Sequence, residues 1–377
     1  MARIHAFHLL NDYSGSPKVL RQALDGLADA GHSVDLYTSQ SGTGFLSDIP
    51  GVRTFDNQYR FVRFVPVRLL VLLYSQLYVL LAGWRRVEAG DTVYVNTLLP
   101  FGGAILGFLR GARVIYHLHE TSVSPEFFKR FLLSWVRWCA TEVIYVSDFL
   151  ARQEPLDKPH HVVWNAIPDA FLRRAAEASP SSGRLRNVLL IASLKRYKGI
   201  DEYVALAAYC PEFQFELVVN ATTSEIADYF GDQRLPDNLT VYPAQRDVHP
   251  FYRRADVVLN LSRPDEWVET FGLTALEGMA YGRPVIVPPV GGIAEVVPDG
   301  RAGYHLTGRD TAGIAARLRE WEAAPARYRS FCAGAREQAM RFTEPCFLVR
   351  IAGIVAGTAH STPGKNFPRM ENIRVKL

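Results

Sequence analysis

The stretch Glu269-Thr270-Phe271-Gly272-Leu273-Thr274-Ala275-Leu276-Glu277 places two acidic residues eight positions apart around a Phe-Gly turn. Leu273, Leu276 and Met279 recur at helical spacing, so we expect a helix that begins near Gly272. Gly282 and Pro284 are typical of a helix end, and the strand-like residues 285–287 follow them. Glu269 is therefore expected in the loop before the helix, and Glu277 about one turn inside it.

The start of this helix is suited to bind a phosphate group. The first backbone N–H groups of a helix have no intrahelical partner, and the helix dipole is positive at this end. Thr270, Phe271, Gly272 and Leu273 could offer such N–H groups, and Gly272 has no Cβ atom to obstruct a ligand. The carboxylate of Glu277 could accept two hydrogen bonds from a ribose, while Glu269 could face a sugar beyond the phosphates.

The stretch resembles the E-x7-E signature of the retaining GT-B glycosyltransferases, in particular their group 1, or family 4. The match extends upstream over residues 255–262 and downstream over residues 282–287 and Gly291-Gly292-Ile293-Ala294-Glu295. Two acids at this spacing also occur on solvated helix faces, but the flanking motifs favour the family. The resemblance covers roughly residues 3–355 and implies two Rossmann-like doubly wound domains that face each other across a cleft.

The composition excludes several other classes of protein. The 377 residues are 48% hydrophobic and 21% charged, which is typical of globular proteins, and the length suggests two domains. A net charge of +4 permits contact with nucleotides or anionic lipids but does not indicate a nucleic-acid-binding protein. The four cysteines form no C-x-x-C pair, so we expect neither a zinc site nor a disulfide framework. The first residues indicate a strand rather than a signal peptide, so we expect a cytoplasmic protein.

Strand and helix patterns alternate along the first half of the chain. Apolar runs at residues 3–10, 33–38, 92–96 and 113–117 predict strands, and their alternation with helical patterns predicts a parallel sheet covered on both faces. Gly15 lies in the loop after the first strand. The resemblance implies that this loop approaches the donor phosphates, and an ordinary strand-to-helix turn is the alternative.

The sequence His117-Leu118-His119-Glu120 ends a predicted strand, where ligands bind in open α/β sheets. By resemblance, His119 corresponds to a histidine near the transferred sugar and the acceptor. A neutral imidazole there could form a hydrogen bond with a sugar hydroxyl. A metal-binding His-x-His pair and a purely structural role are the alternatives, although no third metal ligand is evident.

The apolar run from Leu69 to Trp84 contains several polar residues, and we interpret it as too short and too interrupted for a membrane-spanning helix. We favour a helix packed on the sheet. The alternative is a peripheral contact with the membrane surface, with aromatic side chains at the interface and arginines near anionic head groups. The flanking arginines are Arg60, Arg63, Arg68, Arg85 and Arg86.

A strand is expected at residues 187–191, and a basic loop follows it. The resemblance implies that Lys198 binds the phosphates, with Lys195 or Arg196 replacing the arginine that the family usually has at Ser193. Fixed cations would stabilise the negative charge of a diphosphate leaving group, more strongly in a dry cleft than in water. Surface side chains of an ordinary loop are the alternative. By resemblance, the backbone near Ala244 and Arg246 contacts the nucleotide base.

These patterns divide the chain into four parts. Residues 1–174 are expected to form an N-terminal acceptor-binding domain, and the small and polar residues 175–186 a linker. Residues 187–342 are expected to form the nucleotide-sugar-binding domain. Residues 343–377 would contribute a helix that returns to the first domain, and a tail.

The resemblance implies transfer of a hexosyl group from a UDP- or GDP-linked sugar to a hydroxyl of a glycan or glycolipid, with retention of configuration. Surface polysaccharide or glycolipid synthesis is the expected setting, and His119, Glu269 and Lys198 the catalytic residues. No D-x-D metal motif stands out and no cofactor is expected, so the helix dipole and basic side chains would take the place of a metal ion. A GT-B sugar-nucleotide epimerase and a non-catalytic nucleotide-sugar-binding subunit are the alternatives.

Overall fold

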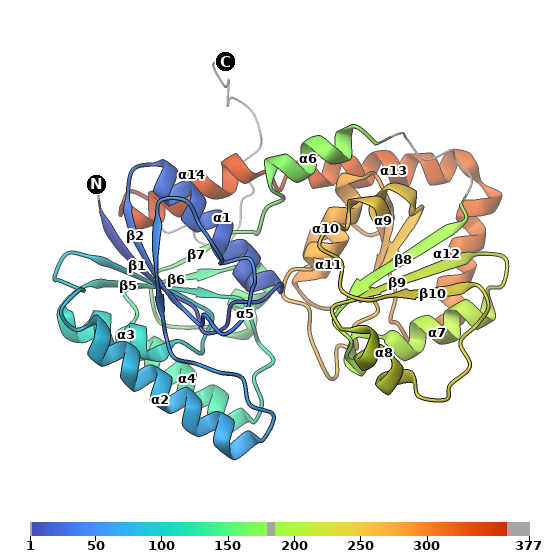
Figure 1. Ribbon diagram of the computed structural model, residues 1–377. Helices are drawn as coiled ribbons and strands as arrows, with labels where there is room; N and C mark the ends of the chain where they lie inside the picture. The colour runs from blue at the N-terminus through green and yellow to red at the C-terminus, as the bar shows by residue number, and fades with distance from the viewer. Residues whose placement is uncertain (1, 179–184, 360–377) are drawn as a thin grey trace.

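The computed structural model describes residues 2–178 and 185–359, which form two α/β domains side by side (Figure 1). The first sheet has seven strands in the order β3-β2-β1-β4-β5-β6-β7, and the second has six in the order β10-β9-β8-β11-β12-β13. The strands of the first sheet are β1 Arg3–Phe7, β2 Ser33–Thr38, β3 Val52–Asp56, β4 Thr92–Asn96, β5 Arg113–Leu118, β6 Glu142–Tyr145 and β7 His160–Val162. Those of the second are β8 Asn187–Ala192, β9 Gln214–Val219, β10 Leu239–Tyr242, β11 Val257–Leu259, β12 Val285–Val287 and β13 Gly303–His305.

Helices cover both faces of each sheet. In the first domain α1 and α14 lie on one face, and α2, α3 and α4 lie on the other (Figure 1). The helices up to the first domain crossing are α1 Gly15–Asp29, α2 Val65–Gly83, α3 Phe101–Arg110, α4 Glu126–Cys139 and α5 Asp148–Gln153. The others are α6 Asp169–Ala176, the 3-10 turn η1 Arg196–Lys198, α7 Ile200–Tyr209, α8 Thr223–Phe230, α9 His249–Arg254, α10 Leu273–Ala280, α11 Gly292–Val296, α12 Thr311–Ala323, α13 Pro325–Ala339 and α14 Glu344–Val355.

The strands are buried on both faces, as their continuous apolar runs predict for parallel sheets. Along β1, Ile4 and Ala6 belong to the core beneath α1 and α14, whereas Phe7 belongs to the core beneath α3. In both sheets the strand order reverses beside the first strand, so β1 pairs with β2 and β4, and β8 pairs with β9 and β11. The prediction of two Rossmann-like doubly wound domains is confirmed.

The chain passes between the domains at two adjacent places. The N–H of Ile167 donates to the carbonyl of Phe342 at 2.9 Å, and Ile167 also forms a parallel bridge with Thr343. Helix α6 then packs on the second domain, where Phe171 contacts the rings of His249, Tyr252 and Tyr281. The first crossing therefore lies before α6, and residues 179–184 of the expected linker lie outside the described residues.

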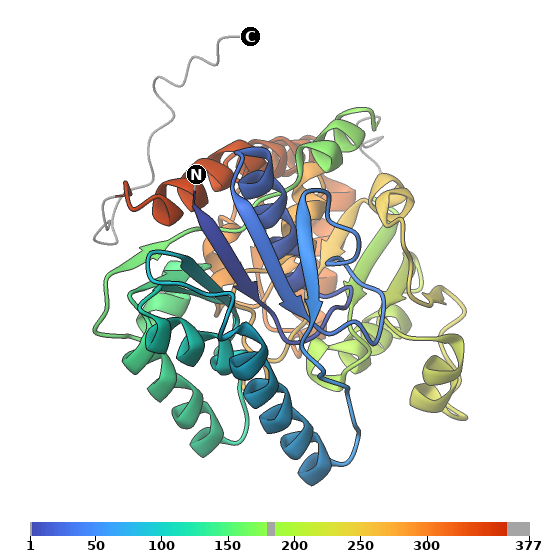
Figure 2. The same ribbon diagram turned by 60° about the vertical axis from the view of Figure 1, so that its left-hand side comes forward.

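Helix α14 returns to the first domain and lies on the same side of its sheet as α1 (Figure 2). Phe347 and Ile351 of α14 share a core with Leu20 and Leu24 of α1. The amide of Gln22 donates to Oε1 of Glu344 at 2.8 Å and so aligns the two helices. Residues 360–377, which include the expected tail, lie outside the described residues.

Helix α2 departs from the favoured interpretation of its sequence. Leu72, Ser75, Gln76, Val79 and Gly83 are buried, but most of its other side chains are exposed. With 19 residues and a mean hydropathy of 1.8, it is also long and apolar enough to cross a membrane by length and composition alone. The interpretation of α2 as a helix buried on the sheet is therefore wrong for most of its surface, as is its description as too short.

Candidate active site

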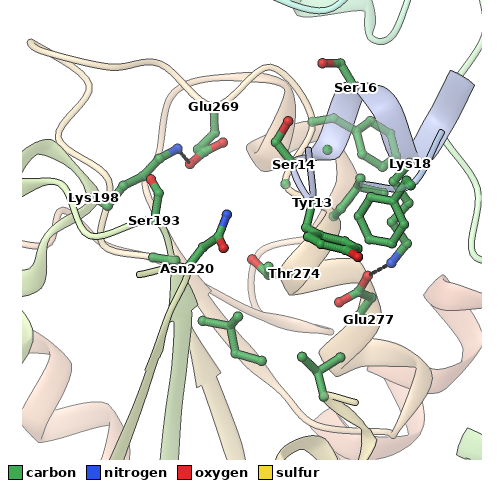
Figure 3. A pocket seen from close by; sticks show the side chains of 18 of the residues that line it. Tyr13, Ser14, Ser16, Lys18, Ser193, Lys198, Asn220, Glu269, Thr274 and Glu277 are labelled. Carbon is green, nitrogen blue, oxygen red and sulfur yellow. Dashed lines mark hydrogen bonds and ion pairs between the residues drawn. The ribbon is translucent and has the colours of Figure 1, made fainter. Parts of the chain in front are cut away.

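A cleft of about 1520 Å³ lies between the two domains. It is lined by loops at the carboxyl ends of strands in both sheets, where open α/β sheets bind ligands. Two ion pairs, Lys198–Glu269 and Lys18–Glu277, stand in different parts of the cleft (Figure 3). The predicted site residues that line the cleft are Gly15, His119, Lys198, Ala244, Arg246, Glu269, Thr270, Phe271, Gly272, Leu273 and Glu277.

Lys195 and Arg196, in contrast, are exposed and do not line the cleft. The short turn η1 directs Tyr197 and Lys198 toward the cleft, while Arg196 faces Asp201 at 3.9 Å. Neither side chain is placed to supply the charge that the sequence analysis assigned to it. Ser193 does line the cleft, at the position where the family usually has arginine.

Helix α10 begins at the wall of the cleft. Its N-cap, Gly272, has a φ of 87°, a left-handed conformation that favours glycine. A Cβ atom at this position would lie 2.4 Å from Cγ1 of Ile293 in α11. The left-handed backbone and this close packing therefore require glycine at position 272. They explain the residue better than the access for a ligand that we expected from the sequence. Because residues 270–274 line the cleft, the free N–H groups at the helix start lie beside it.

Glu277 lies one turn into α10 and is 7% exposed. Its Oε2 atom accepts a hydrogen bond of 2.8 Å from the hydroxyl of Tyr252, and its Oε1 atom pairs with the ammonium of Lys18 in the other domain. Neither partner is predicted from the sequence. For Lys18 a signal existed, since it stands one helical turn after Gly15. The contact between Tyr252 and Glu277 joins residues 25 positions apart and has no comparable local signal.

Glu269 and Lys198 are joined directly. Nζ of Lys198 lies 2.5 Å from Oε1 of Glu269, which also accepts a hydrogen bond of 2.7 Å from the hydroxyl of Ser262. Burial alone would raise the pKa of Glu269, but the Lys198 ammonium and the hydrogen bonds lower it below its usual value. The carboxylate is therefore ionised at neutral pH. Lys198 also lies over the ring of Trp267, 4.9 Å from its centroid.

His119 belongs to a buried hydrogen-bonded chain. Its Nε2 atom lies 2.8 Å from Oδ1 of Asn96, whose amide nitrogen lies 3.0 Å from Nδ1 of His8. Since the amide oxygen can only accept, Nε2 of His119 carries the hydrogen and Nδ1 is left as an acceptor. Burial lowers the pKa of His119 well below its usual value, and the neighbouring His117 and His8 lower it further. The imidazole is therefore neutral at physiological pH.

The metal-binding interpretation of His117 and His119 finds no support in the described parts of the chain. Nδ1 of His117 lies 2.7 Å from the hydroxyl of Tyr94, and burial lowers the pKa of His117 to about 3. Among residues 2–178 and 185–359, no group of three or more His, Cys, Asp or Glu side chains could hold a metal ion.

Direct contacts bring His119 and Glu269 to the same part of the cleft. The hydroxyl of Thr270 donates to the backbone carbonyl of His119 at 2.6 Å. Because Thr270 follows Glu269, this bond fastens the acidic loop of the second domain to the end of β5 in the first. Arg152 and Glu295 form a further ion pair between the domains.

Glu120, which was not among the predicted site residues, also lines the cleft. Burial raises its pKa to about 7, against the opposing effect of backbone hydrogen bonds. These come from the N–H groups of Leu98 at 3.4 Å and His119 at 3.2 Å. Its carboxyl group therefore changes its charge near neutral pH, next to the neutral His119.

Two doubly wound domains with a lined cleft between them define the GT-B class of folds. Residues 13–170 match the family described as Glycosyltransferase Family 4, and residues 186–322 match the family described as Glycosyl transferases group 1. The chain belongs to these group 1, or family 4, glycosyltransferases. The resemblance recognised in the sequence is thereby confirmed.

Individual relatives match part of the chain. A D-inositol 3-phosphate glycosyltransferase of Streptosporangium roseum is 33% identical over 215 residues, which are 56% of this chain and 42% of the relative. An alpha-maltose-1-phosphate synthase of Mycolicibacterium smegmatis is 32% identical over 217 residues, 50% of this chain and 55% of the relative. The chain thus spans about half the length of the curated relatives that it matches.

Solved structures resemble the whole fold. Anabaena HepE in complex with UDP-glucose superposes with a TM-score of 0.76 at 19% identity, covering 95% of this chain and 100% of HepE. Sucrose-phosphate synthase of Thermosynechococcus elongatus gives a TM-score of 0.75 at 20% identity, covering 95% and 99% of the two chains. At these identities the likeness establishes the fold alone.

Proposed function

We propose that the protein transfers a hexosyl group from a nucleotide diphosphate sugar to an acceptor hydroxyl with retention of configuration. The observation that carries the proposal is the convergence of Glu277, Glu269, Lys198 and the start of α10 on one cleft. HepE, which shares the fold, was crystallised with UDP-glucose, and this favours a UDP-linked donor over a GDP-linked one. The family supports a glycan or glycolipid acceptor in surface polysaccharide or glycolipid synthesis.

In this proposal the diphosphate lies at the start of α10. Negative charge develops on the leaving phosphate as its bond to the sugar breaks, and fixed N–H groups and an ammonium stabilise that charge. Lys198 is within 2.5 Å of Glu269 and would turn from it to the phosphate. Glu269 would then be free to accept hydrogen bonds from the sugar hydroxyls. Glu277 would accept those of the ribose once Lys18 has moved aside.

Retention fits attack from the same face as the leaving group. Glu277 is occupied by Tyr252 and is assigned to the ribose, while Glu269 keeps its hydrogen bond from Ser262 and is assigned to the sugar hydroxyls after Lys198 has turned to the phosphate. Neither carboxylate is free to act as the nucleophile of a double displacement. The leaving phosphate would take the proton of the acceptor hydroxyl, and Nδ1 of neutral His119 would accept a hydrogen bond from a sugar hydroxyl.

A donor panel tests this function. The protein is incubated with UDP-, GDP- and ADP-linked hexoses, with and without extracted glycolipid, and free nucleoside diphosphate is measured. Release that depends on the extract, with the new linkage shown by NMR to keep the donor's anomeric configuration, supports a retaining transferase. Isomerisation of the donor sugar without acceptor would indicate an epimerase, and tight donor binding without turnover a non-catalytic subunit. Inversion at the anomeric carbon would overturn the proposed mechanism.

A further inference from the structure

Exposed apolar side chains gather on one surface of the first domain. Within residues 2–178 and 185–359, 17 of the 22 large apolar side chains classed as exposed lie between Phe61 and Trp138. They belong to α2 and the loop before it, the end of α3 and the outer side of α4, which we call the α2 surface. A contiguous surface of this kind marks an interaction site, whereas isolated exposed apolar residues do not. Its most exposed side chains are Phe64, Leu70, Leu81, Phe127 and Trp138, at 66%, 65%, 67%, 74% and 72%.

Helix α2 is held firmly in its domain despite this exposure. The hydroxyl of Ser75 donates to the carbonyl of Asn57 at 2.7 Å, and the N–H of Gly102 donates to Oε1 of Gln76 at 2.9 Å. A Cβ atom at Gly102 would lie 2.5 Å from the carbonyl oxygen of Gln76, so α2 and α3 are in close backbone contact. These bonds keep α2 on its domain, so its apolar outer side is available to lie along a surface.

Positive charges outnumber negative ones around the α2 surface, although Arg60 pairs with Asp56 and Lys129 pairs with Glu154 just outside it. Residues 60–86, 101–110 and 126–139 contain nine Arg or Lys residues and a single acid, Glu126. Arg63, Arg85, Arg130 and Arg137 are exposed. Apolar side chains bordered by arginines, with tyrosine and tryptophan among them, match the interface of an anionic bilayer. An acidic protein surface would satisfy the arginines but would leave no partner for the broad leucine-rich part.

The α2 surface continues into the wall of the cleft. Leu99 and Phe128 line the cleft and also pack against the small core of Leu9, Tyr59 and Leu72 beneath α2. Phe127, the neighbour of Phe128 in α4, is 74% exposed. A membrane against α2 and α4 would therefore lie beside the acceptor side of the cleft.

We propose that the α2 surface docks on an anionic lipid bilayer, with α2 lying along the interface. If the proposed transferase function holds, the acceptor is an amphiphile whose hydroxyl reaches into the cleft while its chains stay in the bilayer. The cytoplasmic leaflet, which carries the anionic lipids, is the matching surface.

Vesicle co-sedimentation tests the docking. Wild-type protein should bind vesicles of phosphatidylcholine with about one third phosphatidylglycerol and bind pure phosphatidylcholine more weakly. The double variant Leu70→Glu, Leu77→Glu should lose binding at least about tenfold, since it puts two charges into the apolar interface. Both side chains are more than half exposed, so the fold should tolerate the change. Val349→Glu on α14, at a 72% exposed site on the other face of the sheet, is the matched control and should bind as wild type.

Two further measurements decide the outcome. Lipids with a doxyl group on the acyl chain should quench the fluorescence of Trp84 and Trp138, which are the two exposed tryptophans among the six. Phe substitutions at both should abolish most of the quenching, because Trp321 is buried and Trp135, Trp164 and Trp267 are partly buried. Wild-type protein that stays in the supernatant with both vesicles would overturn the proposal. So would sedimentation velocity without lipid that shows a dimer which the double variant loses, because a second copy would then cover the surface.

The docking and the proposed function can fail separately. Affinity for UDP and GDP is measured by calorimetry for the wild type and the double variant, and it should be equal. Vesicle binding without nucleotide binding would reject the transferase and leave the docking intact. Nucleotide binding and turnover without vesicle binding would reject the docking alone.

Discussion

Lys18 in α1 forms an ion pair with Glu277 in α10, across the cleft between the two domains. The carboxylate that we assign to the ribose is therefore already paired with an ammonium group of the other domain. A donor must displace Lys18 or share Glu277 with it, and the displaced ammonium would remain close to the start of α10. Contact between the domains and binding of the nucleotide thus compete for, or share, one carboxylate.

Replacement of Lys18 by methionine should loosen the contact between the domains. Glu277 is buried and Lys18 is 24% exposed, so the pair is shielded from water better than surface pairs. In small-angle X-ray scattering, the ligand-free variant should show a larger radius of gyration than the wild type. Arg309→Met is the matched control, since its pair with Asp265 is exposed and lies within the second domain. An unchanged radius in Lys18→Met would show that the ion pair does not hold the cleft closed.

Glu277→Gln should weaken the binding of nucleoside diphosphates about tenfold or more, which corresponds to about 1.4 kcal/mol. The amide offers one uncharged acceptor where the carboxylate offers two charged oxygens. Isothermal titration calorimetry with UDP and GDP measures the effect. Glu322→Gln in α12 serves as control, because this glutamate is exposed and does not line the cleft. Equal affinity in the two variants would remove Glu277 from the ribose site.

Lys198→Ala should lower kcat/KM about 100-fold, the loss typical for one fixed group that stabilises developing charge. The melting temperature should fall only slightly, since the partner Glu269 keeps its hydrogen bond from Ser262. Steady-state rates of nucleoside diphosphate release give the comparison. Lys195→Ala, three residues earlier and outside the cleft, should remain close to wild type. If Lys195→Ala proved the more damaging change, the orientation of η1 would need revision.

Glu120→Gln should stabilise the protein, increasingly so as the pH rises from 5 to 8. The pKa of Glu120 is about 7 in the folded protein, above the ordinary value of a glutamate in the unfolded chain. Between these two values the folded state binds more protons, so the wild type loses stability as the pH rises, and the glutamine variant does not. We expect a difference on the order of 3 kcal/mol at pH 8 and of less than about 1 kcal/mol at pH 5, measured by urea unfolding. A difference that is constant with pH would show that Glu120 titrates normally.

Gly272→Ala should destabilise the second domain by about 2–4 kcal/mol, because it combines a left-handed φ with a contact of 2.4 Å to Ile293. Ile293→Ala in the same chain should recover part of the loss, since it removes the atoms in contact. Gly15→Ala is the milder comparison, with an ordinary contact of 3.5 Å to Leu273, and should cost less than about 1 kcal/mol. Urea midpoints of the three variants provide the test.

The sequence predicted the elements whose pattern is local. The strands expected at residues 33–38 and 92–96 are β2 and β4, and the helix expected to begin near Gly272 is α10. Strand β3 was not expected, because this edge strand has no fully buried residue and so shows no apolar run. Helix α2 was misjudged for the opposite reason, since an apolar sequence does not reveal which of its sides another element covers.

The candidate site divides in the same way. The cleft residues from Glu269 to Glu277 could be predicted, because they lie at the start of one helix and residues next to them in the sequence mark that start. Lys18 and Glu277 are 259 positions apart, and Asn96 and His119 meet only because β4 and β5 are neighbours in the sheet. Lys195 and Arg196 have the expected charge and sequence position. One short turn decided that Lys198 lines the cleft and they do not.

The two segments in which the chain crosses between the domains, at Ile167 and Phe342, are hydrogen-bonded to each other. The covalent connections between the domains therefore lie along one line. We expect any opening of the molecule to be a hinge rotation about this line. The part of the cleft wall at Phe171 lies close to this line, four residues after Ile167. It would therefore move little relative to the first domain during such a rotation. A ligand could therefore bind to this wall in the open form, before the walls farther from the hinge close on it.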